Sequence, residues 1–316
     1  MTQSQSQGAV AVVPERARPQ PLPTFEGNSV GSWVGRGRRF FQVLLETRLV
    51  GTGLTISALV ILCAIFANVL APYPPDAQDY LALTEPPSAT HWLGTDDLGR
   101  DILSRIIFGS RVSLLVGIVA VSIAVTLGVT LGLLGGYIGG LLDDVIMRFV
   151  DSVQAFPGLI LALGITAALG PGIGNAMIAI GFVSIPAMAR LTRGQVLSIR
   201  EREFVHAAQV IGASPLKIMA KHIWPNVTAP IIVQATLLVA TAIVTEASLS
   251  FLGVGVKPPT SSWGSMLRTG SQYLEVAPWL AFAPGLAIFL TVLAFNFVGD
   301  GLRRALDPRL LGGRRG

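Results

Sequence analysis

Residues 112–142 read VSLLVGIVAVSIAVTLGVTLGLLGGYIGGLL, a run of 31 residues without a charged side chain. An α-helix needs about 20 predominantly apolar residues to cross the hydrocarbon core of a bilayer. The run is therefore long enough for one membrane-spanning helix. Further apolar blocks lie at 49–71, 152–189, 227–256 and 276–299, and among them only 227–256 contains a charge, at Glu246. This repetition of long apolar blocks predicts an all-α integral membrane protein.

The number of spans depends on the longest block, residues 152–189. Its 38 residues exceed one span and contain a cluster of helix-breaking residues, Gly170-Pro-Gly-Ile-Gly-Asn175. We divide the block at this cluster and let its second half continue to about residue 196. The chain then has six predicted membrane-spanning helices, at about 49–71, 112–136, 149–169, 175–196, 229–253 and 278–300.

The composition supports this class of protein. Hydrophobic residues make up 51% of the 316-residue chain and charged residues only 13%, whereas soluble domains carry roughly 25% charged residues. A soluble protein with buried helices is the weaker alternative, because the chain has too little polar surface for its size. The net charge of +5 raises the alternative of nucleic-acid binding, but the positions of the basic residues explain it differently.

Lysine and arginine are distributed unevenly over the predicted loops. With the N-terminus inside, the cytoplasmic segments carry 18 of the 23 basic residues and the external segments carry 5. Cytoplasmic loops of membrane proteins are enriched in these residues. We therefore expect both termini in the cytoplasm, no nucleic-acid partner, and a basic N-terminal arm near anionic lipid.

This topology divides the chain into regions of different composition. The N-terminal region is rich in Gln, Ser and Pro and has little periodicity, which is typical of disorder. The predicted regions are a disordered cytoplasmic tail (1–30), an interfacial segment with aromatic and basic residues (31–48), the first membrane helix (49–71), an external segment (72–111), a five-helix core that includes an inner loop at 197–226 (112–302), and a basic cytoplasmic tail (303–316).

The inner loop at 197–226 has the pattern of two short amphipathic helices. Apolar residues recur at i, i+3, i+4 and i+7, first from Phe204 to Ile211 and again from Leu216 to Ile223. Gly212 is a helix-ending residue between the two stripes. Ser214 and Pro215 fit an N-cap and a first turn, Pro225 is expected to end the second helix, and Ala207, Ala208, Met219 and Ala220 complete the stripes.

The pattern alone leaves two interpretations of these helices open. They fit amphipathic helices that lie on the lipid surface, and they fit equally well a compact element that docks into a groove of a soluble partner.

A resemblance to a known motif favours docking. The stretch from His206 to Gly212, nine further residues, and then His222-Ile-Trp-Pro225 resemble the "EAA" loop of ABC importer permeases, which contacts the ATPase subunit. Ala-Ala, Gly and Pro agree in spacing, whereas His206, His222 and Trp224 replace Glu, Ile and Leu of the motif. The resemblance assigns ATPase coupling to Glu203, His206, Ala207, Ala208, Gly212, Ala213, Ser214, Pro215 and Pro225.

Three longer segments are similar to one group of these permeases. Leu93–Arg105, Glu246–Gly264 and Asn296–Pro308 resemble the "C" permeases of dipeptide, oligopeptide, nickel and glutathione importers. The resemblance implies the type I ABC importer permease fold, with six membrane helices and a cytoplasmic coupling loop.

The resemblance also implies a function and a set of partners. These permeases form heterodimers, receive substrate from an extracytoplasmic binding protein, and are driven by two ATPase subunits in the cell membrane of a prokaryote. Because the sequence has no Gly-x-x-x-x-Gly-Lys-Ser/Thr loop, we expect no enzyme activity and no cofactor on this chain, with ATP and Mg²⁺ on the partners. Dipeptides or oligopeptides are the first choice of substrate, glutathione the second and nickel the third.

Two acidic residues lie in or near the predicted spans. Glu246 is a candidate for the substrate pathway, because a carboxylate inside the membrane is costly; the alternative is a structural bond to a backbone amide or a hydroxyl such as that of Thr245 or Ser248. Asp151 is expected to pair with Arg148 three residues earlier.

The remaining polar residues suggest no catalytic or metal site. The three histidines fall on opposite sides of the predicted membrane, so they are not expected to bind one metal ion. An ion-coupled secondary transporter is the alternative from another class; such proteins often have inverted repeats and several ionisable groups within the membrane, and the sequence shows no repeat.

Overall fold

The computed structural model describes residues 48–306. The predicted tail at 1–30, all but the last residue of the interfacial segment at 31–48, and residues 307–316 of the basic tail lie outside the described residues. The described elements are α2 (Arg48–Ile65), α3 (Ala67–Leu70), α4 (Ile102–Ile138), α5 (Gly140–Gln154), α6 (Gly158–Leu169), α7 (Ile173–Arg200), α8 (Glu203–Val210), α9 (Pro215–Ile218), a π-helical turn η1 (Met219–Ile223), α10 (Trp224–Phe251), α11 (Trp263–Gln272) and α12 (Trp279–Leu306).

The described part of the chain is helical, apart from loops and an isolated bridge between Thr95 and Asp101. Five helical stretches are long and apolar enough to cross a membrane: α2, α4, α7, α12, and α10 together with the preceding residues from Pro215. The pair α5 and α6 makes a sixth if its two bent halves count as one span. The all-α membrane fold predicted from the sequence is confirmed.

The third predicted span is not a straight helix, and this part of the prediction was wrong. The chain is helical from Gly140 to Gln154, breaks at residues 155–157, and continues as α6 at an angle of 88°. Pro157 explains the break, because it lacks an N–H and disfavours a helical conformation of Phe156 before it. The turn that precedes this bent pair lies at Gly139 and Gly140, where φ is +73° and +59°.

The second span begins earlier than predicted. Helix α4 starts at Ile102, ten residues before the expected start at 112, and runs for 37 residues, or about 55 Å. Asp101 caps it by accepting a hydrogen bond of 2.8 Å from the backbone N–H of Ser104. Two arginines made this first part of the helix look like a loop in the sequence, and the non-helical segment is limited to residues 71–101.

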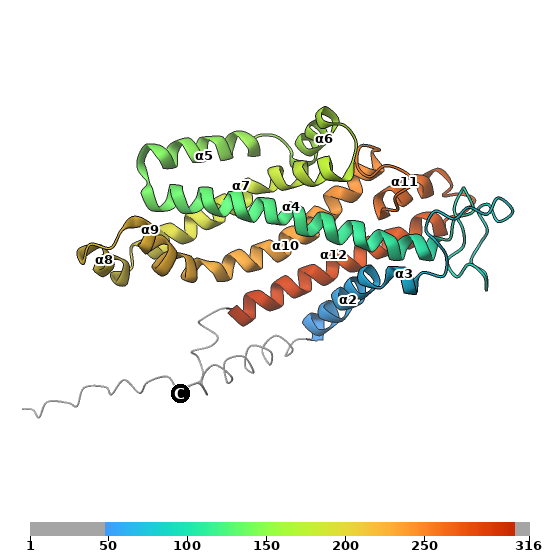
Figure 1. Cartoon of the computed structure of the whole chain (residues 1–316), viewed down its shortest axis with the longest axis horizontal. Helices are drawn as coiled ribbons and strands as arrows, with labels where there is room; N and C mark the ends of the chain where they lie inside the picture. Colours follow the sequence, from blue (N-terminus) through green and yellow to red (C-terminus); the bar gives the residue numbers. More distant parts are fainter. Residues whose placement is uncertain (1–47, 307–316) are drawn as a thin grey trace, which may run out of the picture. The chain divides into compact units, whose positions relative to one another are not determined.

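Glycines allow α4 to approach α7 closely. Gly128, Gly132 and Gly136 recur every four residues on α4, and a Cβ atom on Gly132 would lie 2.6 Å from the carbonyl oxygen of Ala189. Small residues at this spacing bring membrane helices into backbone contact. Helix α10 packs against α4, α7 and α12, and α2 packs against α12. Segment 71–101 lies at one end of these helices and α8 and α9 at the other (Figure 1).

Candidate functional site

The inner loop forms two short helical elements joined by a tight turn, as the sequence predicted. Helix α8 ends at Val210, and Gly212 adopts φ +77°. The N–H of Gly212 donates to the carbonyl of Gln209 at 2.9 Å, and that of Ala213 donates to the carbonyl of Ala208 at 3.0 Å. This arrangement satisfies the last carbonyls of α8, and its left-handed residue is most easily glycine.

One face of the loop is part of the main hydrophobic core. Val205 and Ala208 on α8, Ile218 on α9 and Ile223 in η1 are buried in the same cluster as Val196 of α7. Buried contacts of this kind give a close-packed, stiff connection. The loop is therefore packed firmly against the ends of α7 and α10.

The opposite face of the loop presents apolar side chains to the surface. Val210, Ile211 and Leu216 are 88%, 84% and 76% exposed. Three members of the predicted stripe, Phe204, Ala207 and Ile211, are exposed. Its fourth member, Ala208, is buried together with Val205, which lies outside the stripe. Sequence periodicity missed this division because α8 carries apolar residues on both faces.

Pro225 does not end the second helix, contrary to the prediction. The N–H of Trp224 donates to the carbonyl of Met219, five residues earlier, and the chain then continues as α10 through Pro225 to Phe251. A wider π-type turn absorbs the missing N–H of a proline without interrupting the helix. The inner loop is consequently continuous with the membrane helix that follows it.

The other predicted coupling residues lie around the same turn. Glu203, His206 and Ala207 are exposed on α8, and His206 Nδ1 lies 3.3 Å from Gln209 Oε1. Pro215 occupies the first turn of α9, as predicted. Ser214 sits at the N-cap with an extended backbone but makes no side-chain capping bond.

Glu246 lies in the protein interior. Its side chain is fully buried in α10, and its Oε1 accepts a hydrogen bond of 2.7 Å from the hydroxyl of Ser250. The other oxygen, Oε2, has no hydrogen-bond partner among the described residues. The bond to Ser250 is a hydroxyl contact of the kind that the structural alternative describes. The hydroxyls of Thr245 and Ser248 bond to carbonyls of their own helix instead.

Ion pairs join α5 to α7 near the inner loop. Asp151 binds Arg190 at 2.5 Å rather than the expected Arg148. Asp143 accepts two hydrogen bonds of 2.6 Å from the guanidinium of Arg193, a bidentate geometry that is stronger than a single contact. Both pairs bridge helices that the sequence could not place side by side.

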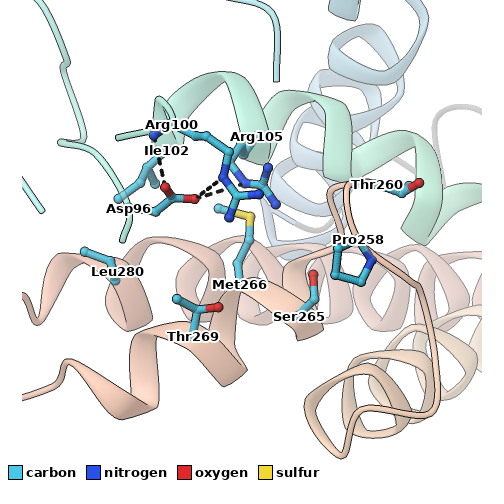
Figure 2. Close-up of a pocket in the computed structure, with 10 residues that line it drawn as sticks. All are labelled: Asp96, Arg100, Ile102, Arg105, Pro258, Thr260, Ser265, Met266, Thr269 and Leu280. Atoms are coloured by element: carbon cyan, nitrogen blue, oxygen red, sulfur yellow. Dashed lines mark hydrogen bonds and ion pairs between the residues drawn. The ribbon is translucent and has the colours of Figure 1, made fainter. Parts of the chain in front are cut away.

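A second group of charges stabilises the external segment (Figure 2). The Nε of Arg100 donates to Asp96 at 2.7 Å, and Arg105 on α4 lies 3.6 Å from the same carboxylate. Arg105 also donates to the carbonyl of Pro75 at 3.0 Å. Burial and the neighbouring Asp96 raise the pKa of Asp97 above its ordinary value.

This charge cluster holds the external segment against α4 and α11. It borders a cavity of about 70 Å³ whose other walls include Met266 and Thr269 of α11. On the same side of α4, Trp263 donates to the carbonyl of Ile106 at 3.0 Å. The sequence reading of this segment missed these contacts, although Leu93–Arg105 contains their Asp and Arg residues.

Comparison with known proteins identifies the family. Residues 128–312 match the family described as "Binding-protein-dependent transport system inner membrane component". The chain belongs to this family. Residues 35–87 match a second family, "N-terminal TM domain of oligopeptide transport permease C", so both matches agree with the resemblance found in the sequence.

Similar members of the transport family are named for peptide substrates. The chain is 48% identical over 276 residues to the "Glutathione transport system permease protein GsiD" of Shigella flexneri, covering 86% of this chain and 90% of the relative. It is 45% identical over 290 residues to the "Dipeptide transport system permease protein DppC" of Alkalihalophilus pseudofirmus, covering 92% and 94%.

A solved structure confirms the fold of the family. A chain of the inward-facing MetNI methionine ABC transporter matches with a TM-score of 0.54 and 18% identity, covering 65% of this chain and 98% of that one. The chain described here is thus a multi-pass permease subunit of a bacterial ABC importer in the inner membrane. This membership replaces the ion-coupled secondary transporter considered from the sequence.

Proposed function

We propose that this permease is one of two different membrane subunits of an ATP-driven importer of dipeptides or oligopeptides. An external binding protein delivers the peptide, and two ATPase subunits bind ATP and Mg²⁺ on the cytoplasmic side. The chain itself performs no catalysis. Its termini and the inner loop face the cytoplasm, in agreement with the uneven distribution of basic residues.

The exposed apolar face of the inner loop is the observation that carries this proposal. Val210, Ile211 and Leu216 surround the Gly212 turn and are largely exposed. Large apolar side chains gathered on one exposed surface mark an interaction site. The predicted coupling residues Glu203 and His206 lie on the same helix, α8, and give the surface a polar rim.

The buried face of the inner loop would transmit motion of the ATPase subunits to the membrane helices. Closure of the ATPase subunits would move α8 and α9 as a unit, because Val205, Ile218 and Ile223 are packed into the main core. The same core contains residues of α7 and α10. Ion pairs from α7 to α5 then extend the rigid body to a third helix. Motion of packed helices as units is a common form of transport switching.

The substrate class is proposed from the relatives. One relative is named for glutathione and another for dipeptides, and both substrates are short peptides with free carboxylates. Glutathione is therefore the second candidate for this chain. Among the described residues, no group of three or more His, Cys, Asp or Glu residues is arranged to hold a metal ion, and no relative reported above is named for nickel.

Purification of the complex tests the proposal. The tagged chain, extracted in mild detergent, should bring down a second permease and two ATPase subunits, identified by mass spectrometry. Val210→Asp or Leu216→Asp should reduce recovery of the ATPases while the second permease is retained. Leu81→Asp is a matched control, because Leu81 is 99% exposed but lies in the external segment, away from the loop.

Transport by the reconstituted complex tests the substrate. Proteoliposomes containing the full complex and its binding protein should accumulate a labelled dipeptide when ATP is present on the side that carries the ATPase subunits. Collapse of the proton gradient should not abolish this uptake. Glutathione uptake without dipeptide uptake would select the second candidate. Isolation of the chain alone in several detergents, or unchanged ATPase recovery with Val210→Asp and Leu216→Asp, would contradict the coupling role.

A further inference from the structure

A large cavity lies between α7, α10 and α12, close to the inner loop. Its volume is about 640 Å³, within the range of about 300–1,000 Å³ that small-molecule sites occupy. Polar side chains from all three helices border it: Gln195 of α7, Asn226 and Gln234 of α10, and Asp300 and Arg303 of α12. The helices thus border a peptide-sized cavity with a mixed polar and apolar lining.

Two residues of the cavity lining, Asn226 and Gln234, belong to a polar stripe along α10. Asn226, Gln234, Thr241, Thr245 and Ser248 follow at spacings of eight, seven, four and three residues, which places them on one face of a helix. All five are partly or fully exposed. The buried residues of α10, among them Val227, Ile231 and Leu238, belong to the main core.

Four members of the stripe, all except Gln234, bond to carbonyls one turn earlier in the chain. Polar side chains within the membrane usually face other helices or a water-filled cavity, because hydrocarbon offers no hydrogen-bond partner. Gln234 is ten residues into α10 and has a primary amide that both donates and accepts. The amide of Gln234 is therefore expected to face a water-filled space, and it borders the cavity next to the inner loop.

The chemistry of the lining matches the backbone of a short peptide. The amides of Gln195, Asn226 and Gln234 each offer one donor group and one acceptor group, as a peptide bond does. Asp300 and Arg303 lie three residues apart on α12 and carry opposite charges. A free ammonium group complements the carboxylate of Asp300, and a free carboxylate complements the guanidinium of Arg303, which binds carboxylates in two-pronged geometry.

We propose that this cavity binds a short zwitterionic peptide by its backbone and its two charged termini, independently of its side chains, as the peptide leaves for the cytoplasm. This inference rests on the proposed peptide import and assigns part of its route. Because backbone and termini are common to all short peptides, the cavity would accept whatever peptide the binding protein has selected. A second permease that fills the same space is the competing occupant, and the following experiment separates the two.

Thiol labelling in the assembled complex tests the proposal without relying on transport. Cys63 is the single cysteine of the chain, so Gln234→Cys and Gln195→Cys are each made with Cys63→Ser. A charged, water-soluble methanethiosulfonate reagent is applied to the purified complex, and modification of this chain is followed by mass spectrometry. Ile232→Cys is the matched control, because Ile232 is 44% exposed on α10 but does not border the cavity.

The expected result is rapid labelling of Gln234→Cys and protection by the dipeptide alanyl-alanine. At ten times its dissociation constant the dipeptide should slow labelling by about tenfold, because about one site in ten stays free. N-acetyl-alanyl-alanine amide, which lacks both charges, should protect far less. Labelling of Ile232→Cys should be unaffected by either compound.

Two neighbouring arginines of α12 test whether the guanidinium of Arg303 binds the peptide carboxylate, with Arg304 as the control. Arg303→Gln should weaken protection by alanyl-alanine by roughly tenfold, the usual effect of losing one charge-assisted hydrogen bond. Protection by alanyl-alanine amide, which has a free ammonium group but no carboxylate, should be unchanged. Arg304→Gln, whose side chain is exposed and outside the cavity lining, should behave as wild type.

The outcomes also separate this inference from the proposed function. If the complex imports dipeptide but Gln234→Cys and Gln195→Cys are both inert or unprotected, the cavity is not a peptide site and the import proposal stands. Equal protection by the blocked and free dipeptides would overturn recognition of the termini. A wild-type complex that imports no peptide would instead refute the proposed function.

Discussion

Replacement of Gly212 tests whether the geometry of the inner loop couples it to transport. Gly212 has φ +77°, and a Cβ atom built on it would meet no other heavy atom within 4 Å. A substitution there is therefore opposed by the backbone conformation alone, not by a clash. Left-handed geometry costs a residue with a Cβ roughly 1–2 kcal/mol, with more for a β-branched side chain and less for asparagine.

These costs predict an order among the variants. If Gly212→Val loses about 2 kcal/mol in the native turn, alternative turn geometries gain about thirtyfold in relative population. We expect Gly212→Val to lower ATP-driven dipeptide uptake by about tenfold or more, because a shifted turn misplaces both α8 and α9. Gly212→Asn should keep most of the uptake, since asparagine tolerates positive φ.

The assay is initial uptake by proteoliposomes that contain the complete complex at equal amounts of each variant. Recovery of the ATPase subunits with the tagged chain gives a second readout, and the amount of inserted protein controls for folding. Normal uptake with Gly212→Val would refute the reasoning. Equal losses with Gly212→Asn and Gly212→Val would also refute it, because they would show that glycine is needed for a reason other than its positive φ.

Three further predictions concern the stability of the purified protein. Gly132→Ala should lower the melting temperature, with a cost of about 1–3 kcal/mol for overpacking, because its Cβ would lie 2.6 Å from Ala189 O. Gly164→Ala should leave the melting temperature unchanged, because its Cβ would meet no atom within 4 Å. Equal effects of the two variants would contradict close helix packing. Arg193→Leu should cost on the order of 2 kcal/mol, because it leaves the buried carboxylate of Asp143 without its bidentate bonds. The double variant with Asp143→Asn should recover part of this loss in chemical unfolding, and no recovery would argue against the pair. Burial raises the pKa of Asp97, so the ionised side chain destabilises the folded state above the usual aspartate pKa of about 3.9. Asp97→Asn should therefore raise the melting temperature at pH 7, and this gain should shrink as the pH falls toward 4. A gain that is independent of pH would contradict this titration of Asp97.

The class of protein was readable from the sequence because membrane solvation acts on local composition. A span must satisfy its backbone within one helix and present apolar side chains to lipid, so each long block such as 112–142 is visible without knowledge of its neighbours. The glycine at position 212 was also readable, since a positive φ is a local requirement. The order and spacing of several motifs then indicated the permease family, which the comparisons confirmed.

Two helix boundaries were predicted wrongly because the local sequence patterns were ambiguous. Arg105 and Arg111 made the start of α4 resemble a loop, whereas the folded chain pairs Arg105 with Asp96 and carries both residues on the helix. Pro225 looked like a helix end, but a π-type turn accommodates it. In the first case an ion pair stabilises an arginine on the helix, and in the second a wider turn accommodates the proline; neither is visible in the local sequence pattern.

What the sequence by itself determined is the membrane class, most of the helices, the turn at Gly212 and the family of the chain. Only the tertiary structure decided that Asp151 pairs with Arg190, that Glu246 is buried against Ser250, and that Gln195, Gln234 and Arg303 border one cavity. The physical reason is the distance along the sequence over which each kind of interaction acts. Solvation by lipid and backbone geometry act on neighbouring residues, whereas ion pairs and cavities join residues from helices whose mutual placement depends on how all of them pack.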